Sequence, residues 1–204
     1  MNVVKASVSF DFPIVPEAML RNIELAGRTC YKSEHKITAD SAKAFVRTLI
    51  RSGHESVLEH EKISIRVICD RGISHEIVRH RLCSYSQEST RYCDYGDGQV
   101  KFIDMAGYLT PEQYLVWGMA MVSAEKTYEE LRKLGVKPQL ARNVLPNSLK
   151  TEIVWSADLR EWRLILKQRT SKAAHPQMRE LAGMILDEFN RLLPEVFEDI
   201  VAGV

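Results

Sequence analysis

The chain has no long apolar segment of the kind that directs a protein into or across a membrane. Its 204 residues contain no run approaching the roughly 18 apolar residues that span a bilayer. The N-terminal stretch 1–12 also contains no uninterrupted apolar core like that of a signal peptide. We therefore expect a cytoplasmic protein with no membrane partner.

The chain also lacks closely spaced cysteine pairs, and its net charge is small. The four cysteines, at positions 30, 69, 83 and 93, form no C-x-x-C pair, so we expect free thiols rather than disulfides or zinc ligands. The formal net charge is only +1, which argues against a general nucleic-acid-binding protein. Any anion must therefore be bound by a local cluster of arginines and lysines.

The composition is that of an ordinary globular protein. Hydrophobic residues make up 45% of the chain and charged residues 27%, and a chain of this length fits a single core. No internal repeat, low-complexity tract or linker marks a boundary. We predict one domain over residues 1–204.

Few strands and several helices predict an α+β fold. Alternating apolar and polar residues predict strands over 3–10 and 62–69, with a third over 99–104. Helical spacing predicts helices over residues 16–27, 39–53, 73–81, 110–134, 155–166 and 175–193. Because strands and helices do not alternate regularly, we predict a small, mostly antiparallel sheet packed by several helices.

Two of these helices carry more specific expectations. Asp70 and Ser74 are candidate N-terminal caps of the helix over 73–81. Trp155 and Trp162 lie on one apolar stripe of the helix over 155–166. We expect both tryptophans to pack in the core rather than to contact a cofactor.

The segment 79–92, RHRLCSYSQESTRY, is the most informative part of the chain. It places three arginines, a histidine and a run of hydroxyl and amide groups within fourteen residues. Arginine supplies forked donors to phosphate, and serine, threonine and glutamine can donate to and accept from ribose and base edges. The segment indicates a nucleotide site, with a solvated, charged helix end as the alternative.

Arg79-His80-Arg81, followed by seven residues and Ser89, resembles the signature of the flavin-dependent thymidylate synthases, and Arg91-Tyr92 continues it. Four further segments resemble the same family in the same order, within about residues 26–180. These are 26–31 (AGRTCY), 53–60 (GHESVLEH), 141–146 (the AR-x-x-LP pattern) and 155–169, which ends in the family's base-binding arginine.

The resemblance implies the family's fold and a reductive methylation of dUMP to dTMP. It implies FAD as cofactor, methylenetetrahydrofolate as carbon donor, NADPH as reductant, and a homotetramer whose active sites are assembled from several subunits. The implied FAD-binding residues are Ser56, Arg79, His80, Arg81, Gln87, Asp158 and Arg160. The implied dUMP-binding residues are Glu76, Arg79, Gln87, Glu88, Ser89, Thr90, Arg91, Arg142 and Arg169.

Within that scheme Arg169 is the expected catalytic residue, because a fixed guanidinium can stabilise the anion that develops at N3 and O4 of uracil. Arg91 and Arg142 would neutralise the dUMP phosphate. Three positions depart from the family pattern. Glu76 and Gln87 stand where some relatives have Gln and Glu, and Leu164 replaces a polar residue near the flavin.

The sequence also contains residues that could serve other chemistries. His54 and His60 are six residues apart, roughly 240° around a helix, so they cannot bind one zinc ion from a single helix face as a metalloprotease pair would, and no metal site is expected. We interpret Ser89 as a phosphate or substrate ligand rather than a nucleophile, and Cys83 as a small buried residue. A nucleotide- or RNA-binding module without redox chemistry is the remaining alternative.

Overall fold

The computed structural model describes residues 1–203, and the chain groups into two compact units. Unit 1 comprises residues 1–7, 66–79 and 85–154. Unit 2 comprises residues 8–65, 80–84 and the chain from residue 155 onward. One domain over residues 1–204 stays a prediction.

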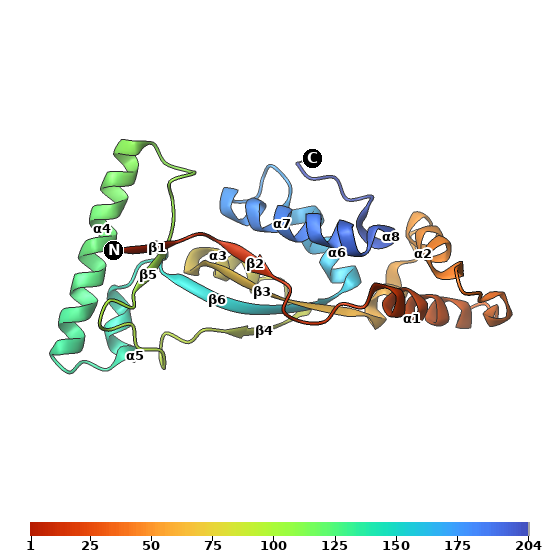
Figure 1. Cartoon of the computed structure of the whole chain (residues 1–204), viewed down its shortest axis with the longest axis horizontal. Coiled ribbons are helices and arrows are strands. Elements are labelled where there is room, and N and C mark those ends of the chain that lie inside the picture. The colour runs from red at the N-terminus through yellow and green to blue at the C-terminus, as the bar shows by residue number, and fades with distance from the viewer. Residues whose placement is uncertain (204) are drawn as a thin grey trace. The chain divides into compact units, whose positions relative to one another are not determined.

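The strands form a four-stranded sheet and a separate two-stranded pair (Figure 1). The strand order of the larger sheet is β2 (Ser7–Ser9), β3 (Lys62–Asp70), β6 (Lys150–Asp158) and β4 (Cys83–Gln87). Strands β3 and β6 are antiparallel, since the Leu159 amide donates to the Glu61 carbonyl (3.0 Å) at one end and the Arg71 amide to the Leu149 carbonyl (3.1 Å) at the other. The pair consists of β1 (Asn2–Val4) and β5 (Lys101–Ile103), which run parallel.

Unit 1 packs its helices around an aromatic core. Its helices are α3 (Arg71–Ile77), α4 (Pro111–Lys133), α5 (Pro138–Ala141) and the 3-10 helix η3 (Arg142–Val144). Phe102, Tyr128 and Leu149 are at most 1% exposed and belong to one apolar cluster. Helix α4 begins at a capping box in which Thr110 and Gln113 satisfy each other's backbone amides.

Unit 2 is built around a cluster of aromatic rings that meet at tilted or edge-on angles. Its helices are α1 (Pro16–Thr29), η1 (Glu34–Lys36), α2 (Ser41–Arg51), η2 (Glu55–His60), α6 (Leu159–Arg169), α7 (Pro176–Leu192) and α8 (Pro194–Phe197). The Trp162 ring centroid lies 4.8 Å from that of Trp155 and 5.3 Å from that of Phe189. The Trp162 indole N–H donates to the Ile63 carbonyl (3.0 Å) and ties α6 to β3. Both tryptophans are core residues, as expected.

The helix predicted over 155–166 is wrong in its first part. Residues 150–158 form strand β6, and α6 begins only at Leu159. Thr151, Ile153, Trp155 and Ala157 are buried in alternation, which is the period of a strand with one covered face. Trp155 is the last large buried residue of β6 before the chain turns into α6. Its distance of seven residues from Trp162 therefore imitates helical spacing, although Trp155 itself lies in a strand.

Several other boundaries also differ from expectation. The predicted strand over 3–10 is divided into β1 and β2, and the helix predicted over 73–81 ends at Ile77. Asp70 is the cap of that helix, since its carboxylate accepts the Ile73 amide (2.7 Å), whereas the Ser74 hydroxyl donates to the Arg71 carbonyl. Strand β4 was not predicted, because its sequence CSYSQ is short and mostly polar.

The sequence also led to expectations about membrane-spanning segments and about the cysteines. No helix among residues 1–203 has the length and apolar character needed to cross a membrane. Cys30 is exposed and Cys69 is buried, and both are free thiols. Burial, with Asp70 nearby, raises the pKa of Cys69 to about 12. Cys83 is half-buried rather than buried as expected.

Candidate functional site

In unit 1 the turn after β4 lies against η3 and α5. The Arg142 guanidinium donates through Nη1 to the Thr90 hydroxyl (2.9 Å), and the Arg91 Nε donates to the Gln139 amide oxygen (3.4 Å). The Ser89 hydroxyl accepts the backbone amide of Arg91 (3.3 Å), which fixes the turn locally. Four of the residues expected to bind the nucleotide are thus brought together from segments about 50 residues apart in the sequence.

A pocket of about 320 Å³ opens beside this turn. Its lining is Arg71, Thr90, Arg142, Asn143, Leu145, Pro146, Asn147 and Leu149. Two arginines and no carboxylate, among residues 1–203, therefore face this space. The Arg71 guanidinium forms no ion pair or hydrogen bond within the described chain. The charge balance of the pocket suits an anion such as a phosphate group.

Arg71 is a candidate that sequence analysis missed. The signal was available, because Arg71 directly follows a buried strand and its capping residue Asp70, at the strand end where the chain turns into α3. It was overlooked because Arg71 lies outside the segment with the highest density of arginines.

Two of the predicted nucleotide ligands form hydrogen bonds with other side chains of unit 1. The Gln87 amide nitrogen donates to the Ser74 hydroxyl (2.9 Å) and the Thr151 hydroxyl (3.1 Å). The Glu88 carboxylate accepts from the Tyr95 hydroxyl (2.9 Å) and the Lys150 ammonium (2.8 Å). Burial, together with the hydrogen bond to Glu88, raises the pKa of Tyr95.

In unit 2 His80 and Arg169 are in direct contact. The Arg169 Nε donates to the Nε2 atom of His80 at 2.9 Å, although the two residues are 89 positions apart. Arginine is a donor only, so this contact requires His80 Nε2 to be unprotonated and places the ring proton on Nδ1. The Nδ1 atom lies 3.8 Å from the Glu161 carboxylate, and the ring is 5.9 Å from that of Trp155.

The other predicted flavin ligands are distributed as follows. Asp158 caps α6 by accepting the Glu161 amide (2.8 Å), and Arg160 is paired with Glu59. Ser56 is exposed near the start of η2. Arg81 is exposed and forms no ion pair within residues 1–203, and the same is true of Arg79 in unit 1. Glu76, a predicted nucleotide ligand, is half-buried in unit 1.

Comparison with known proteins identifies the family to which the chain belongs. The family model described as "Thymidylate synthase complementing protein" matches residues 16–195. A flavin-dependent thymidylate synthase of Geobacter sulfurreducens is 33% identical over 196 residues, covering 92% of this chain and 83% of that relative. The chain belongs to the flavin-dependent thymidylate synthase family. This confirms the resemblance carried by Arg79-His80-Arg81 and Ser89.

Further relatives agree with membership of the flavin-dependent thymidylate synthases. A probable flavin-dependent thymidylate synthase of Mycobacterium phage L5 is 34% identical over 191 residues, covering 87% of this chain and 79% of that relative. A UMP/dUMP methylase, PolB, from Streptomyces cacaoi, solved with 5-Br dUMP bound, superposes with a TM-score of 0.81 at 22% identity. That superposition covers 97% of this chain and 96% of PolB, so the two proteins share a fold.

The chain's arginines fit the flavin cofactor for which the family is named. Arg79 and Arg81 present guanidinium groups that no carboxylate of residues 1–203 neutralises, and such groups suit the diphosphate of FAD. His54 and His60 are both exposed, and no cluster of three or more His, Cys, Asp or Glu side chains arranged to bind a metal occurs among residues 1–203.

The buried His80 makes stability depend on pH. Burial, with the nearby Arg169 cation, lowers the pKa of His80 from 6.5 to about 4. Between these values the unfolded chain binds a proton that the folded protein does not, so stability decreases as pH falls from 6.5 to 4. We expect a contribution of up to about 3 kcal/mol.

Urea unfolding of the wild type and of His80→Asn between pH 7 and 4 measures this contribution. As the pH is lowered from 7 to 4, the free energy of unfolding of the wild type should fall more steeply than that of the variant. Parallel pH dependence of the two proteins would show that His80 does not titrate abnormally.

Proposed function

We propose that this chain catalyses the flavin-dependent reductive methylation of dUMP to dTMP. Methylenetetrahydrofolate is the proposed carbon donor and NADPH the proposed reductant. The proposal extends family membership to a specific substrate, and the known proteins that support it are the thymidylate synthases and the dUMP methylase described above.

The contact between Arg169 and His80 is the observation that carries the proposal. The histidine is the middle residue of the Arg-His-Arg signature, and the arginine is the last residue of α6. A neutral imidazole that accepts from Arg169 Nε orients the rest of the guanidinium without neutralising its charge. Arg169 thereby keeps a full positive charge.

Arg169 is the group proposed to act on the uracil ring. Methylation at C5 requires electron density at that carbon, which rises as negative charge develops on N3 and O4. A guanidinium held in place before the reaction stabilises this charge without reorganising solvent. Arginine does not act as a base at neutral pH, so its role is electrostatic.

The phosphate of dUMP is proposed to bind in unit 1. Arg142 lines the 320 Å³ pocket, and Arg91 lies on the adjacent turn. Arg71 adds a second cation to the pocket and is proposed as a further phosphate ligand. The hydroxyls of Ser89 and Thr90 supply neutral donors beside these charges, while Glu76, Gln87 and Glu88 are proposed to line the nucleotide site.

The flavin is proposed to bind through the Arg-His-Arg signature together with η2 and α6. The proposed ligands are Ser56, Arg79, His80, Arg81, Gln87, Asp158 and Arg160. Bound FAD supplies the hydride for the reduction, with electrons from NADPH. The protein's own contribution is to hold the reactants in register and to provide fixed charge.

We also propose a cytoplasmic homotetramer whose active sites are each assembled from several subunits. One domain per chain, the folate partner and the absence of a metal requirement belong to the same proposal. Apolar side chains of α4 are consistent with contact between copies, since Leu115, Val116 and Met119 are 68%, 67% and 70% exposed.

The proposal is tested first by absorption spectroscopy of the purified protein from 300 to 550 nm. Addition of FAD should give bands near roughly 370 and 450 nm that travel with the protein through gel filtration, and dUMP should shift them. Bound flavin whose bands respond to dUMP supports a shared flavin and nucleotide site.

The opposite result has a defined meaning. A protein that binds no flavin at any concentration, yet binds dUMP or polyanions in a salt-dependent way, is a nucleotide- or RNA-binding module. The arginines of segment 79–91 would then bind phosphate without redox chemistry.

A further inference from the structure

We propose that Arg163 is a positioning residue for the flavin-binding segment at Ser56. Arg163 fixes this segment through Glu55, and Asp199 near the end of the chain fixes Arg163 in turn. The inference rests on the proposed role of Ser56 in flavin binding. All of these residues belong to unit 2.

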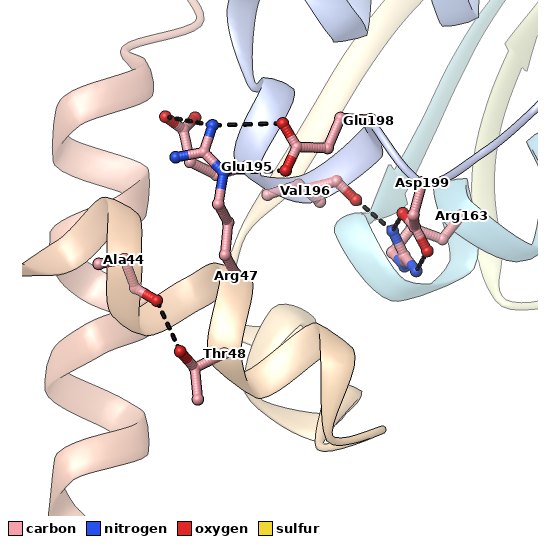
Figure 2. A network of polar contacts seen from close by, with 8 residues as sticks. All are labelled: Ala44, Arg47, Thr48, Arg163, Glu195, Val196, Glu198 and Asp199. Carbon is pink, nitrogen blue, oxygen red and sulfur yellow. Dashed lines mark hydrogen bonds and ion pairs between the residues drawn. The ribbon is translucent and has the colours of Figure 1, made fainter.

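The Arg163 guanidinium is enclosed by acceptors on two sides. Its Nε donates to the Glu55 carboxylate (3.1 Å), and its Nη2 lies 3.0 Å from the same carboxylate. Its Nη1 and Nη2 donate to the two oxygens of Asp199 (2.6 and 2.7 Å), and Nη1 also donates to the Val196 carbonyl. Figure 2 shows the face of this cluster formed with Val196 and Asp199.

The cluster places a charge in the protein interior. The Arg163 side chain is 2% exposed, so its charge requires nearby carboxylates. Burial alone would lower the pKa of Arg163, but the hydrogen bonds and charges of Asp199 and Glu55 raise it overall. The guanidinium fork is fully used, since each nitrogen has at least one acceptor.

Glu55 connects this cluster to the proposed flavin site. It is the first residue of η2, and Ser56 follows it directly. The chain enters η2 through a tight turn in which Gly53 has a φ of +73°, a conformation that favours glycine. The contact between Glu55 and Arg163 holds the residue that directly precedes Ser56, and through it fixes where Ser56 lies.

Arg163 is also part of the second flavin-binding segment. It lies on α6, which begins after Asp158, includes Arg160 and ends at Arg169. Helix α6 packs against η2. One guanidinium therefore sets the spacing between two segments that are proposed to contact the same cofactor.

A second arginine provides a matched control. Arg47 on α2 also contacts the C-terminal segment, residues 195–199. It donates to Glu198 (2.9 Å) and lies 3.6 Å from Glu195 (Figure 2). Within residues 1–203 it forms no side-chain hydrogen bond or ion pair with η2 or α6, and its side chain is 30% exposed. Loss of the Arg47 contacts should loosen the same C-terminal segment without moving Ser56.

The experiment makes the same substitution at both arginines. In Arg163→Lys the charge is kept, but a single ammonium cannot reach Glu55 and Asp199 in the forked geometry. We expect the Kd for FAD, measured by titration of flavin fluorescence, to rise at least about tenfold in Arg163→Lys and to change less than about twofold in Arg47→Lys. The flavin bands should also shift in Arg163→Lys alone.

Hydrogen exchange gives a second measurement that needs no flavin. The amides of residues 54–60 should exchange at least about tenfold faster in Arg163→Lys than in Arg47→Lys. If Arg163→Lys does not fold, Asp199→Asn takes its place, with Glu198→Gln as its control. Asp199 is half-exposed, with a side-chain exposure of 47%, so its substitution is better tolerated.

Two results would overturn the inference. One is wild-type FAD affinity and an unshifted flavin spectrum in Arg163→Lys accompanied only by a lower melting temperature, which makes Arg163 a purely structural residue. The other is unchanged exchange of residues 54–60. A wild-type protein that binds no FAD refutes the proposed function instead, and the exchange measurement then still decides whether Arg163 fixes the segment.

Discussion

Arg169→Ala is expected to lower kcat about 10²–10³-fold while FAD remains bound. The variant removes the guanidinium that stabilises charge developing on the uracil ring, and a donor of this kind contributes on that scale. It also removes the donor to His80 Nε2. Steady-state turnover of dUMP with FAD, methylenetetrahydrofolate and NADPH gives kcat, and a flavin titration gives the Kd for FAD.

Lys167→Ala is the control for this variant, because Lys167 is an exposed cation on the same helix. Its kcat should equal that of the wild type. A kcat for Arg169→Ala close to the wild-type value would remove Arg169 from the chemistry. Loss of FAD in Arg169→Ala would assign the residue to cofactor binding instead.

Trp162→Ala is expected to destabilise the protein by about 3–5 kcal/mol. The Trp162 ring is fully buried against Trp155 and Phe189, and truncation leaves both a cavity and a buried Ile63 carbonyl without its indole donor. For a chain of this size the melting temperature should fall by about 6–20 °C. Thermal unfolding followed by circular dichroism measures the change.

Leu164→Ala is the matched control on α6. Leu164 is 47% exposed, so its truncation should change the melting temperature by only about 1–2 °C. A small effect of Trp162→Ala, comparable with that of Leu164→Ala, would show that the aromatic cluster is not the main source of stability in unit 2.

Local sequence patterns predict the strands and helices only where one period dominates. Ile63, Ile65 and Val67 alternate with polar residues, and β3 follows that pattern closely. Around residue 155 two periods overlap, because Trp155 fits both the alternation of β6 and the helical spacing of α6. Residues 150–158 form a strand because β6 pairs between β3 and β4. This pairing is long-range, so a local sequence pattern does not contain it.

The candidate site shows the same division. Segment 79–92 was recognisable because its arginines and hydroxyls are contiguous in the sequence. The contact of His80 with Arg169 could be expected only through the family resemblance, since 89 residues separate the two. Arg163 carried no signal of its own, because its significance depends on the carboxylates of Glu55 and Asp199 that the fold brings near it.

The buried thiol of Cys69 provides a natural reporter of strand opening. Its side chain is 1% exposed, and a pKa of about 12 leaves almost no thiolate at neutral pH, whereas Cys30 is exposed to solvent. Alkylating reagents therefore reach Cys69 only when the end of β3 separates from its neighbours. The rate of its modification, compared with that of Cys30, reports how often this end of β3 opens in the intact enzyme, with no engineered label.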